Sequence, residues 1–127
     1  MTTALILPVA LGGALGAVSR LLASGAIMHR MGANFPYGTM AVNVLGSLAI
    51  GAVAGWFLRE GVEAKPTLQA FLITGFLGGF TTFSAFSLDA YTLLQRGDTQ
   101  TALIYAFASI LLTIAACALG IWLVKAA

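Results

Sequence analysis

The segment GFLGGFTTFSAFS, Gly75–Ser87, interrupts the third of four long apolar stretches in this chain. Gly75, Gly78 and Gly79 weaken a helix there, because each glycine costs about 1 kcal/mol relative to alanine. Two threonines follow, and a threonine hydroxyl can cap the free N–H groups of a restarting helix. Non-helical backbone at membrane depth is tolerated only where protein or a cavity satisfies its polar groups. The segment therefore predicts a third helix broken near Gly75 to Thr82, with its second half beginning at Thr81 or Thr82.

The composition around this segment is that of an integral membrane protein. Hydrophobic residues make up 60% of the 127 residues and charged residues only 8%, which leaves too little polar surface for a soluble domain. Each apolar stretch reaches the roughly 20 residues that a membrane-spanning helix needs. We predict an all-α integral membrane protein, a single four-helix transmembrane domain over residues 1–127 with spans Ala4–Met28, Tyr37–Leu58, Leu68–Leu94 and Thr101–Val124. The first span is expected to be retained rather than cleaved, and a net charge of +2 does not favour nucleic acid as a partner.

The loops specify orientation weakly. With four spans, Arg30 and Arg96 fall on one side of the membrane, whereas Arg59, Lys65 and Lys125 fall on the other. The positive-inside rule then has a bias of one basic residue to act on. We predict dual topology and an antiparallel homodimer. The alternative is that the amino terminus and the lipid fix one orientation.

Glycines recur at four-residue spacing in the first three spans, as Gly12 with Gly16, Gly51 with Gly55, and Gly75 with Gly79. A stripe without side chains lets helix backbones approach closely in lipid. A tight bundle of four helices leaves little room for an aqueous path inside one chain. An ion path is therefore predicted between subunits, and a homodimer is the smallest solution.

Polar residues inside the first two spans mark candidate functions. Arg20 in the first span either snorkels to the interface or forms an electropositive vestibule for anions. Asn43 lies in the second span with Thr39 one turn earlier on the same face. Its neutral amide offers two N–H donors to an anion, and an interhelical hydrogen bond is the alternative role.

The fourth span places Tyr105, Ser109 and Thr113 four residues apart, so that their hydroxyls form one stripe. Such hydroxyls often bond back to their own helix, but opposite Asn43 the stripe is interpreted as one wall of a polar track. Asp89 is the only acid within a span, and it lies toward the end of the third.

The broken span itself offers two kinds of ion contact. Carbonyls freed at the break suit a hard monovalent cation. Phe80 and Phe83 lie beside the break, and the positive edge of an aromatic ring can contact a small anion. Packing in the bundle core is the alternative for these rings, and Phe86 is assigned to packing.

Three segments resemble the Fluc family of fluoride channels, over nearly the whole chain. They are GGALGAVSR (Gly12–Arg20), YGTMAVNVLGSLAIG (Tyr37–Gly51) and GFLGGFTTFSAFSLD (Gly75–Asp89). The resemblance implies an antiparallel, dual-topology homodimer in the bacterial inner membrane, with two fluoride pores and a structural sodium ion (Na+) on the symmetry axis. Asp89 stands where glutamate is common in that family.

The resemblance also implies roles for single residues. Asn43 would be the pore asparagine, and Phe80 and Phe83 would be the rings that line the pores. Gly75 and Gly78 would give backbone carbonyls to sodium. Hydroxyls near the anion path would come from Thr81, Thr82 and Ser84, and Arg20 would lie at a vestibule.

These observations predict passive, selective fluoride efflux by a protein that is not an enzyme. The first alternative is a small multidrug-resistance type exporter, but such exporters use a glutamate in the first span, where this chain has Arg20. The second is a structural subunit without transport activity, which leaves the broken span and the polar stripe unexplained.

Overall fold

The computed structural model describes residues 2–59, 62–63 and 65–127, and that part of the chain contains helices and no strand. Four helices are long and apolar enough to cross a membrane, as predicted. In chain order the elements are α1 (Thr2–Met31), α2 (Tyr37–Phe57), α3 (Pro66–Gln69), the π-helix η1 (Ala70–Leu77), α4 (Gly78–Phe80), α5 (Phe83–Gln95) and α6 (Thr99–Ala126). The third span is thus assembled from α3, η1, α4 and α5.

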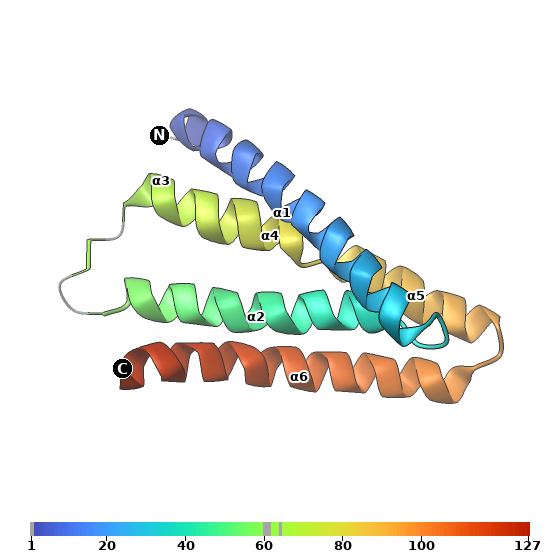
Figure 1. The fold of residues 1–127 in the computed structure, drawn as a ribbon. Helices are drawn as coiled ribbons and strands as arrows, with labels where there is room; N and C mark the ends of the chain where they lie inside the picture. Colours follow the sequence, from blue (N-terminus) through green and yellow to red (C-terminus); the bar gives the residue numbers. More distant parts are fainter. Residues whose placement is uncertain (1, 60–61, 64) are drawn as a thin grey trace.

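Successive spans run antiparallel, so the start of α1, the end of α2, the start of α3 and the end of α6 lie at one end of the bundle (Figure 1). The connections after α1 and after α5 lie at the other end. Each of these two connections contains a glycine with positive φ, 86° at Gly32 and 78° at Gly97. L side chains rarely adopt this conformation. Asp98 then caps α6 by accepting a hydrogen bond from the Thr101 amide.

The third span is broken, but later and more sharply than the glycines suggest. The backbone stays helical from Pro66 to Phe80 and becomes extended only at Thr81 (φ −88°, ψ 157°) and Thr82 (φ −153°, ψ 119°). The glycines are accommodated by a π-helix, in which the Gly78 amide reaches back to Ile73. The restart agrees with prediction, because the Thr82 hydroxyl caps α5 by accepting from the Ala85 amide.

Glycine contacts hold α2 against α6, which lie side by side along their lengths (Figure 1). A Cβ added to Gly51 would overlap the Cys117 carbonyl, and one added to Gly120 would overlap the Leu48 carbonyl. A Cβ on Gly55 would lie 3.2 Å from Ile121. Backbones in lipid associate through such close packing.

A second glycine contact joins α1 to the first half of the broken span. A Cβ on Gly12 would overlap the Phe71 carbonyl oxygen, one on Gly16 would overlap the Phe76 carbonyl oxygen, and Gly75 packs back on Gly12. The predicted role of the four-residue glycine spacing is confirmed in both helix pairs.

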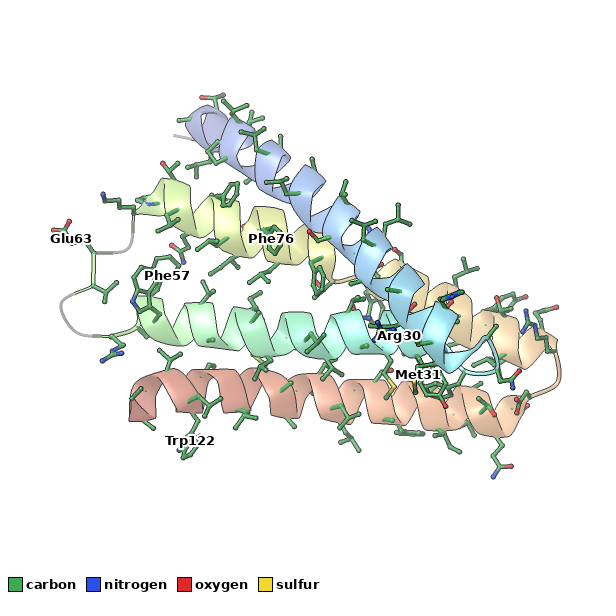
Figure 2. The ribbon with its side chains drawn as sticks, in the orientation of Figure 1. Arg30, Met31, Phe57, Glu63, Phe76 and Trp122 are labelled. Carbon is green, nitrogen blue, oxygen red and sulfur yellow. The ribbon has the colours of Figure 1, made fainter. Side chains whose placement is uncertain are left out.

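The outer faces carry large apolar side chains, such as Leu21, Phe107 and Trp122. Figure 2 shows Trp122 projecting away from the bundle on α6. The buried core is small and lies where α5 and α6 meet, around Leu93, Ala102 and the fully buried Tyr105. Phe86, in the second turn of α5, packs against this core, which ties the start of α5 to α6.

Candidate functional site

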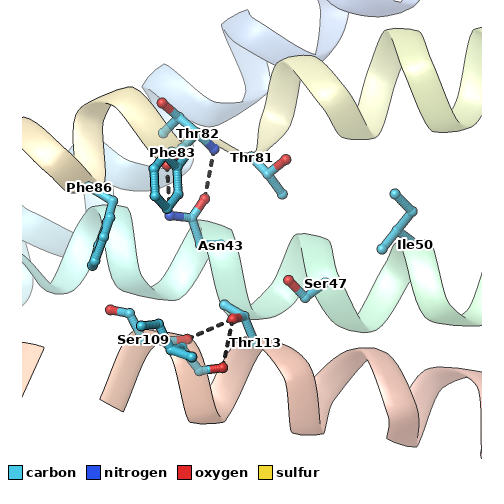
Figure 3. Close-up of a pocket in the computed structure, with 10 residues that line it drawn as sticks. Asn43, Ser47, Ile50, Thr81, Thr82, Phe83, Phe86, Ser109 and Thr113 are labelled. Atoms are coloured by element: carbon cyan, nitrogen blue, oxygen red, sulfur yellow. Dashed lines mark hydrogen bonds between the residues drawn. The ribbon is translucent and has the colours of Figure 1, made fainter. Parts of the chain in front are cut away.

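A groove of about 290 Å³ runs along the middle of the bundle, between α2, the break and α6. Its walls are neutral, and aromatic, aliphatic and hydroxyl side chains alternate along them (Figure 3). The lining residues are Asn43, Ser47, Ile50, Thr81, Thr82, Phe83, Phe86, Ser109, Ile110 and Thr113. Every charged side chain is outside this set. A groove of this kind offers neutral donors and ring edges to a small ligand.

The side chain of Asn43 on α2 is hydrogen-bonded to the extended backbone of the break at Thr82. Its Nδ2 donates to the Thr82 carbonyl at 2.9 Å, and its Oδ1 accepts from the Thr82 amide at 2.7 Å (Figure 3). The amide oxygen therefore gives the Thr82 N–H a partner in place of the Gly78 carbonyl, which would accept it in a continuous helix. Of its two N–H donors, one bonds to the Thr82 carbonyl and one remains for a ligand. The predicted hydrogen bond from Asn43 to another span is thus present, and its predicted contact with an anion stays a prediction.

Most of the predicted hydroxyls are already bonded to backbone. Thr81 Oγ1 donates to the Leu77 carbonyl, and Thr113 Oγ1 donates to the Ser109 and Ile110 carbonyls. The Thr82 hydroxyl caps α5 and lies 3.3 Å from Ser84 Oγ. Ser84 is exposed and lies outside the groove lining.

Ser109 differs from these hydroxyls. Its side chain is 5% exposed, it lines the groove, and its Oγ has no hydrogen-bond partner among the described residues. A buried polar group without a partner costs free energy, and its presence in a native structure points to a bound ligand, ion or water.

Tyr105, the first member of the predicted stripe, lies outside the groove. Its ring packs between Phe35 and Phe86, and its hydroxyl donates to Asp89 Oδ2 at 3.2 Å. Thr39 is half-buried on α2 and also lies outside the groove lining. The stripe is therefore divided, because only Ser109 and Thr113 reach the groove.

The phenylalanines are separated by the break. Phe83 is 78% exposed, lines the groove and lies 5.4 Å from Phe86 between ring centroids. Phe80 stacks on Phe76 at 6.3 Å and packs on α2 at Gly46. Extended backbone at residues 81–82 thus turns Phe80 away from the groove that Phe83 lines. The predicted role of both rings in lining the two pores of a dimer stays a prediction. Phe86, which the sequence assigned to packing, lines the groove instead.

The freed carbonyls lie at the end of α4. The helical partner of the Gly78 carbonyl would be the Thr82 amide, which bonds to Asn43 instead. The Gly75 carbonyl, by contrast, accepts the Gly78 amide within the helix. The Gly78 carbonyl thus lacks its helical partner and the Gly75 carbonyl has one, and the sodium site at these two carbonyls stays a prediction. Among the described residues, no group of three or more His, Cys, Asp or Glu side chains could hold a metal.

Arg20 reaches the same helix end from α1. Its Nε donates to the Gly79 carbonyl at 3.0 Å, and the residue is half-buried. A small pocket of about 210 Å³ lies beyond Tyr105 toward the end of the bundle, lined by Asp89 and Arg96 among others. Arg20 lies outside the lining of both this pocket and the groove. Its predicted vestibule role stays a prediction.

Sequence reasoning also missed Ser47 and Ile50. A signal for Ser47 was present, because it follows Asn43 by four residues and shares its helix face. For Phe86 the signal was its three-residue spacing from Phe83 within α5.

The sequence matches one family model and is similar to several named proteins. The family described as "CrcB-like protein, Camphor Resistance (CrcB)" matches residues 7–121. A protein of Rhizobium meliloti (strain 1021), named fluoride-specific ion channel FluC, is 49% identical over 121 residues, which cover 95% of this chain and 96% of the relative. Relatives with the same name from Rhodospirillum centenum and Hyphomonas neptunium are 46% and 44% identical, with at least 92% of each chain covered.

Proposed function

The chain belongs to the family of CrcB-like proteins, and from this membership we propose that it is a fluoride-selective ion channel that releases fluoride from the cytoplasm. It is a multi-pass protein of the bacterial plasma membrane and a transport protein rather than an enzyme. Relatives that are 44–49% identical over most of the chain carry the name fluoride-specific ion channel.

The observation that carries the proposal is the free hydroxyl of Ser109 in a groove without charged side chains. A hydroxyl donor and the remaining Asn43 N–H can each replace part of the hydration shell of fluoride. Neutral donors hold an anion more weakly than a lysine would. Weak binding at several successive points permits conduction.

The rings of Phe83 and Phe86 supply the selectivity in this proposal. Their positive edges contact a small anion, and their width keeps the path narrow and largely dry. Fluoride is the smallest halide, so it approaches hydroxyl and amide donors closely, whereas larger halides fit poorly.

Transport needs no energy-coupling group. An inside-negative potential drives an anion outward with about 2.3 kcal/mol per 100 mV. Fluoride that enters as neutral HF and dissociates inside is trapped as an anion until a channel releases it. The acidic group nearest the groove, Asp89, is bonded to Tyr105 at the end of the bundle, which is not the position of a proton-coupling carboxylate in the first span.

We further propose that two chains pair in antiparallel orientation and that the pair carries two pores. The Phe83 ring lines the groove and is 78% exposed in a single chain. A second copy would close the groove. Two equivalent grooves then follow from two-fold symmetry.

A structural sodium ion belongs to the same proposal. The Gly75 and Gly78 carbonyls would be its ligands, and its positive charge would neutralise carbonyls that are freed at the break. The support is the loss of a helical partner at Gly78.

The decisive experiment is fluoride efflux from liposomes that contain the purified protein. We expect fluoride to leave rapidly when valinomycin and potassium dissipate the counter-potential, and chloride to stay. Liposomes without protein are the control. Efflux no faster than in those liposomes, or equal efflux of both halides, would refute the proposed function.

Orientation needs a separate test. Reporters fused to the carboxyl terminus should give signal from both sides of the membrane, since Arg59, Lys65 and Lys125 barely outnumber Arg30 and Arg96. A signal from one side alone would contradict dual topology and leave the channel function standing.

A further inference from the structure

We propose that a second groove, which lies between α1 and α3, binds an anionic phospholipid, with Lys65 at its phosphate and an acyl chain between the two helices. This α1–α3 groove has a volume of about 750 Å³ and shares no lining residue with the groove that contains Ser109. Its volume is in the range of about 300–1,000 Å³ that is usual for sites of small ligands. The inference does not depend on the proposed fluoride channel, because it concerns another surface of the chain.

The shape of the α1–α3 groove follows from the glycine contact between α1 and the third span. The two backbones touch at Gly12, where an added Cβ would overlap the Phe71 carbonyl oxygen. Toward their starts the two helices separate (Figure 1). Leu7 and Leu11 line the space between them from α1, and Leu68 and Phe71 line it from the third span. The glycine contact thus marks the deep end of the groove.

The polarity of the lining changes along the groove as it does along a lipid molecule. Lys65 is the one charged side chain among the described lining residues, and it is exposed directly before α3. Thr67 adds a hydroxyl in the first turn of that helix. Phe71 follows Lys65 by six residues, about 9 Å along the helix axis. A phosphate bound at Lys65 would therefore place an acyl chain along Leu68 and Phe71.

The groove also lies at the depth where a phospholipid is present. Two of the membrane-spanning segments begin beside it, one at Thr3 and the other at Pro66. Lys65 is therefore placed at the edge of the hydrocarbon, where long basic side chains reach the headgroups. The side chains of Leu7 and Leu11 are 66% and 53% exposed, so an acyl chain in the groove has apolar surface to cover.

The charge of the lining selects the headgroup. Arg59 and Glu63 lie on the same connection as Lys65 but outside the lining, so Lys65 sets the sign of the charge in the groove. A basic residue at a membrane surface raises the affinity for an anionic lipid about 5-fold. A free phosphate ion would meet this charge and leave the apolar walls uncovered, whereas a phospholipid matches both the charge and the walls.

The test is native mass spectrometry of the purified protein in a nonionic detergent, with phosphatidylglycerol as the anionic probe and phosphatidylcholine as the zwitterionic one. We expect wild-type protein to bind phosphatidylglycerol at least about 5-fold more tightly than phosphatidylcholine. Lys65→Gln should lower the affinity for phosphatidylglycerol about 5-fold and remove this preference. Lys125→Gln is the matched control, because Lys125 lies at the same end of the bundle on α6 and outside the lining. It should bind like wild type.

A second pair of variants tests the apolar walls. Leu11→Trp fills the groove and should weaken phosphatidylglycerol binding at least about 10-fold. Leu111→Trp places the same side chain at an exposed position of α6 outside the lining, and it should bind like wild type.

Three results would overturn the inference. Equal weakening by Lys65→Gln and Lys125→Gln would show that the lipid responds to surface charge alone. Wild-type lipid binding by Leu11→Trp would place the lipid elsewhere. The same spectra also give the number of chains in each complex, so a Leu11→Trp variant that loses a second chain and keeps its lipid would assign the groove to that second copy.

Discussion

Replacing Asn43 with leucine tests whether one amide holds the broken segment in place. The side chain makes two hydrogen bonds to the backbone of Thr82, at 2.9 and 2.7 Å. Leucine has a similar volume and no polar atom, so the Thr82 amide loses its partner, and the Thr82 carbonyl keeps only its bond within α5. The break would then have to move toward water or toward another donor.

The magnitude follows from the two bonds, which are part-buried. The Thr82 amide loses its partner at a cost of about 1–3 kcal/mol, and the carbonyl loses a second bond worth about 0.5–1.5 kcal/mol. The sum is about 1.5–4.5 kcal/mol, and its lower bound corresponds to about a 10-fold fall in the population of the native break. We expect the free energy of unfolding to fall by at least about 1.5 kcal/mol and fluoride efflux to fall at least about 10-fold.

The assay combines denaturant unfolding of the purified protein in detergent with efflux from liposomes. Ser47→Ala is the matched control, because Ser47 follows Asn43 on the same face and lines the same groove without a bond to the break. Its effect on stability should stay within about 0.5 kcal/mol. An Asn43→Leu variant as stable and as active as this control would show that the break is held by other contacts.

Further predictions concern the rings, the free hydroxyl and the glycine contact. Phe83→Ile should reduce efflux more than about 10-fold with little change in stability, since this ring is 78% exposed. Phe80→Ile should lower stability and change efflux little, and equal effects of the two variants on efflux would contradict the assignment. Ser109→Ala should lower efflux about 10-fold without lowering stability, because the hydroxyl has no partner in the fold; unchanged efflux would remove this hydroxyl from the path. Gly16→Ala should destabilise the bundle by about 2 kcal/mol or more, because its Cβ would overlap the Phe76 carbonyl, and wild-type thermal stability would count against tight packing there.

The sequence predicts much of the fold because lipid imposes simple rules. Four apolar stretches of sufficient length must be helices, and their bounds are met within a few residues. The glycine spacing identifies the close helix contacts, and the threonine after the glycines identifies the capped restart at Thr82. These features depend on residues near one another in the chain.

The site is predicted less well, because it depends on contacts between distant residues. Phe80, Phe83 and Phe86 would share a face of one continuous helix, since each follows the last by three residues. The extended backbone at residues 81–82 turns Phe80 onto α2 and leaves the other two together. The local sequence does not predict which helix each ring packs against after the break.

The sequence by itself thus determined a membrane-spanning four-helix chain with a broken third helix, because hydrophobic length and glycine spacing act locally. Only the tertiary structure decided where the break falls and what holds it. Asn43, 39 residues away, takes the Thr82 amide, and Arg20, 59 residues away from Gly79, takes the carbonyl that the break releases. The physical reason is that a backbone group leaves a helix only where a partner from another helix replaces its lost hydrogen bond.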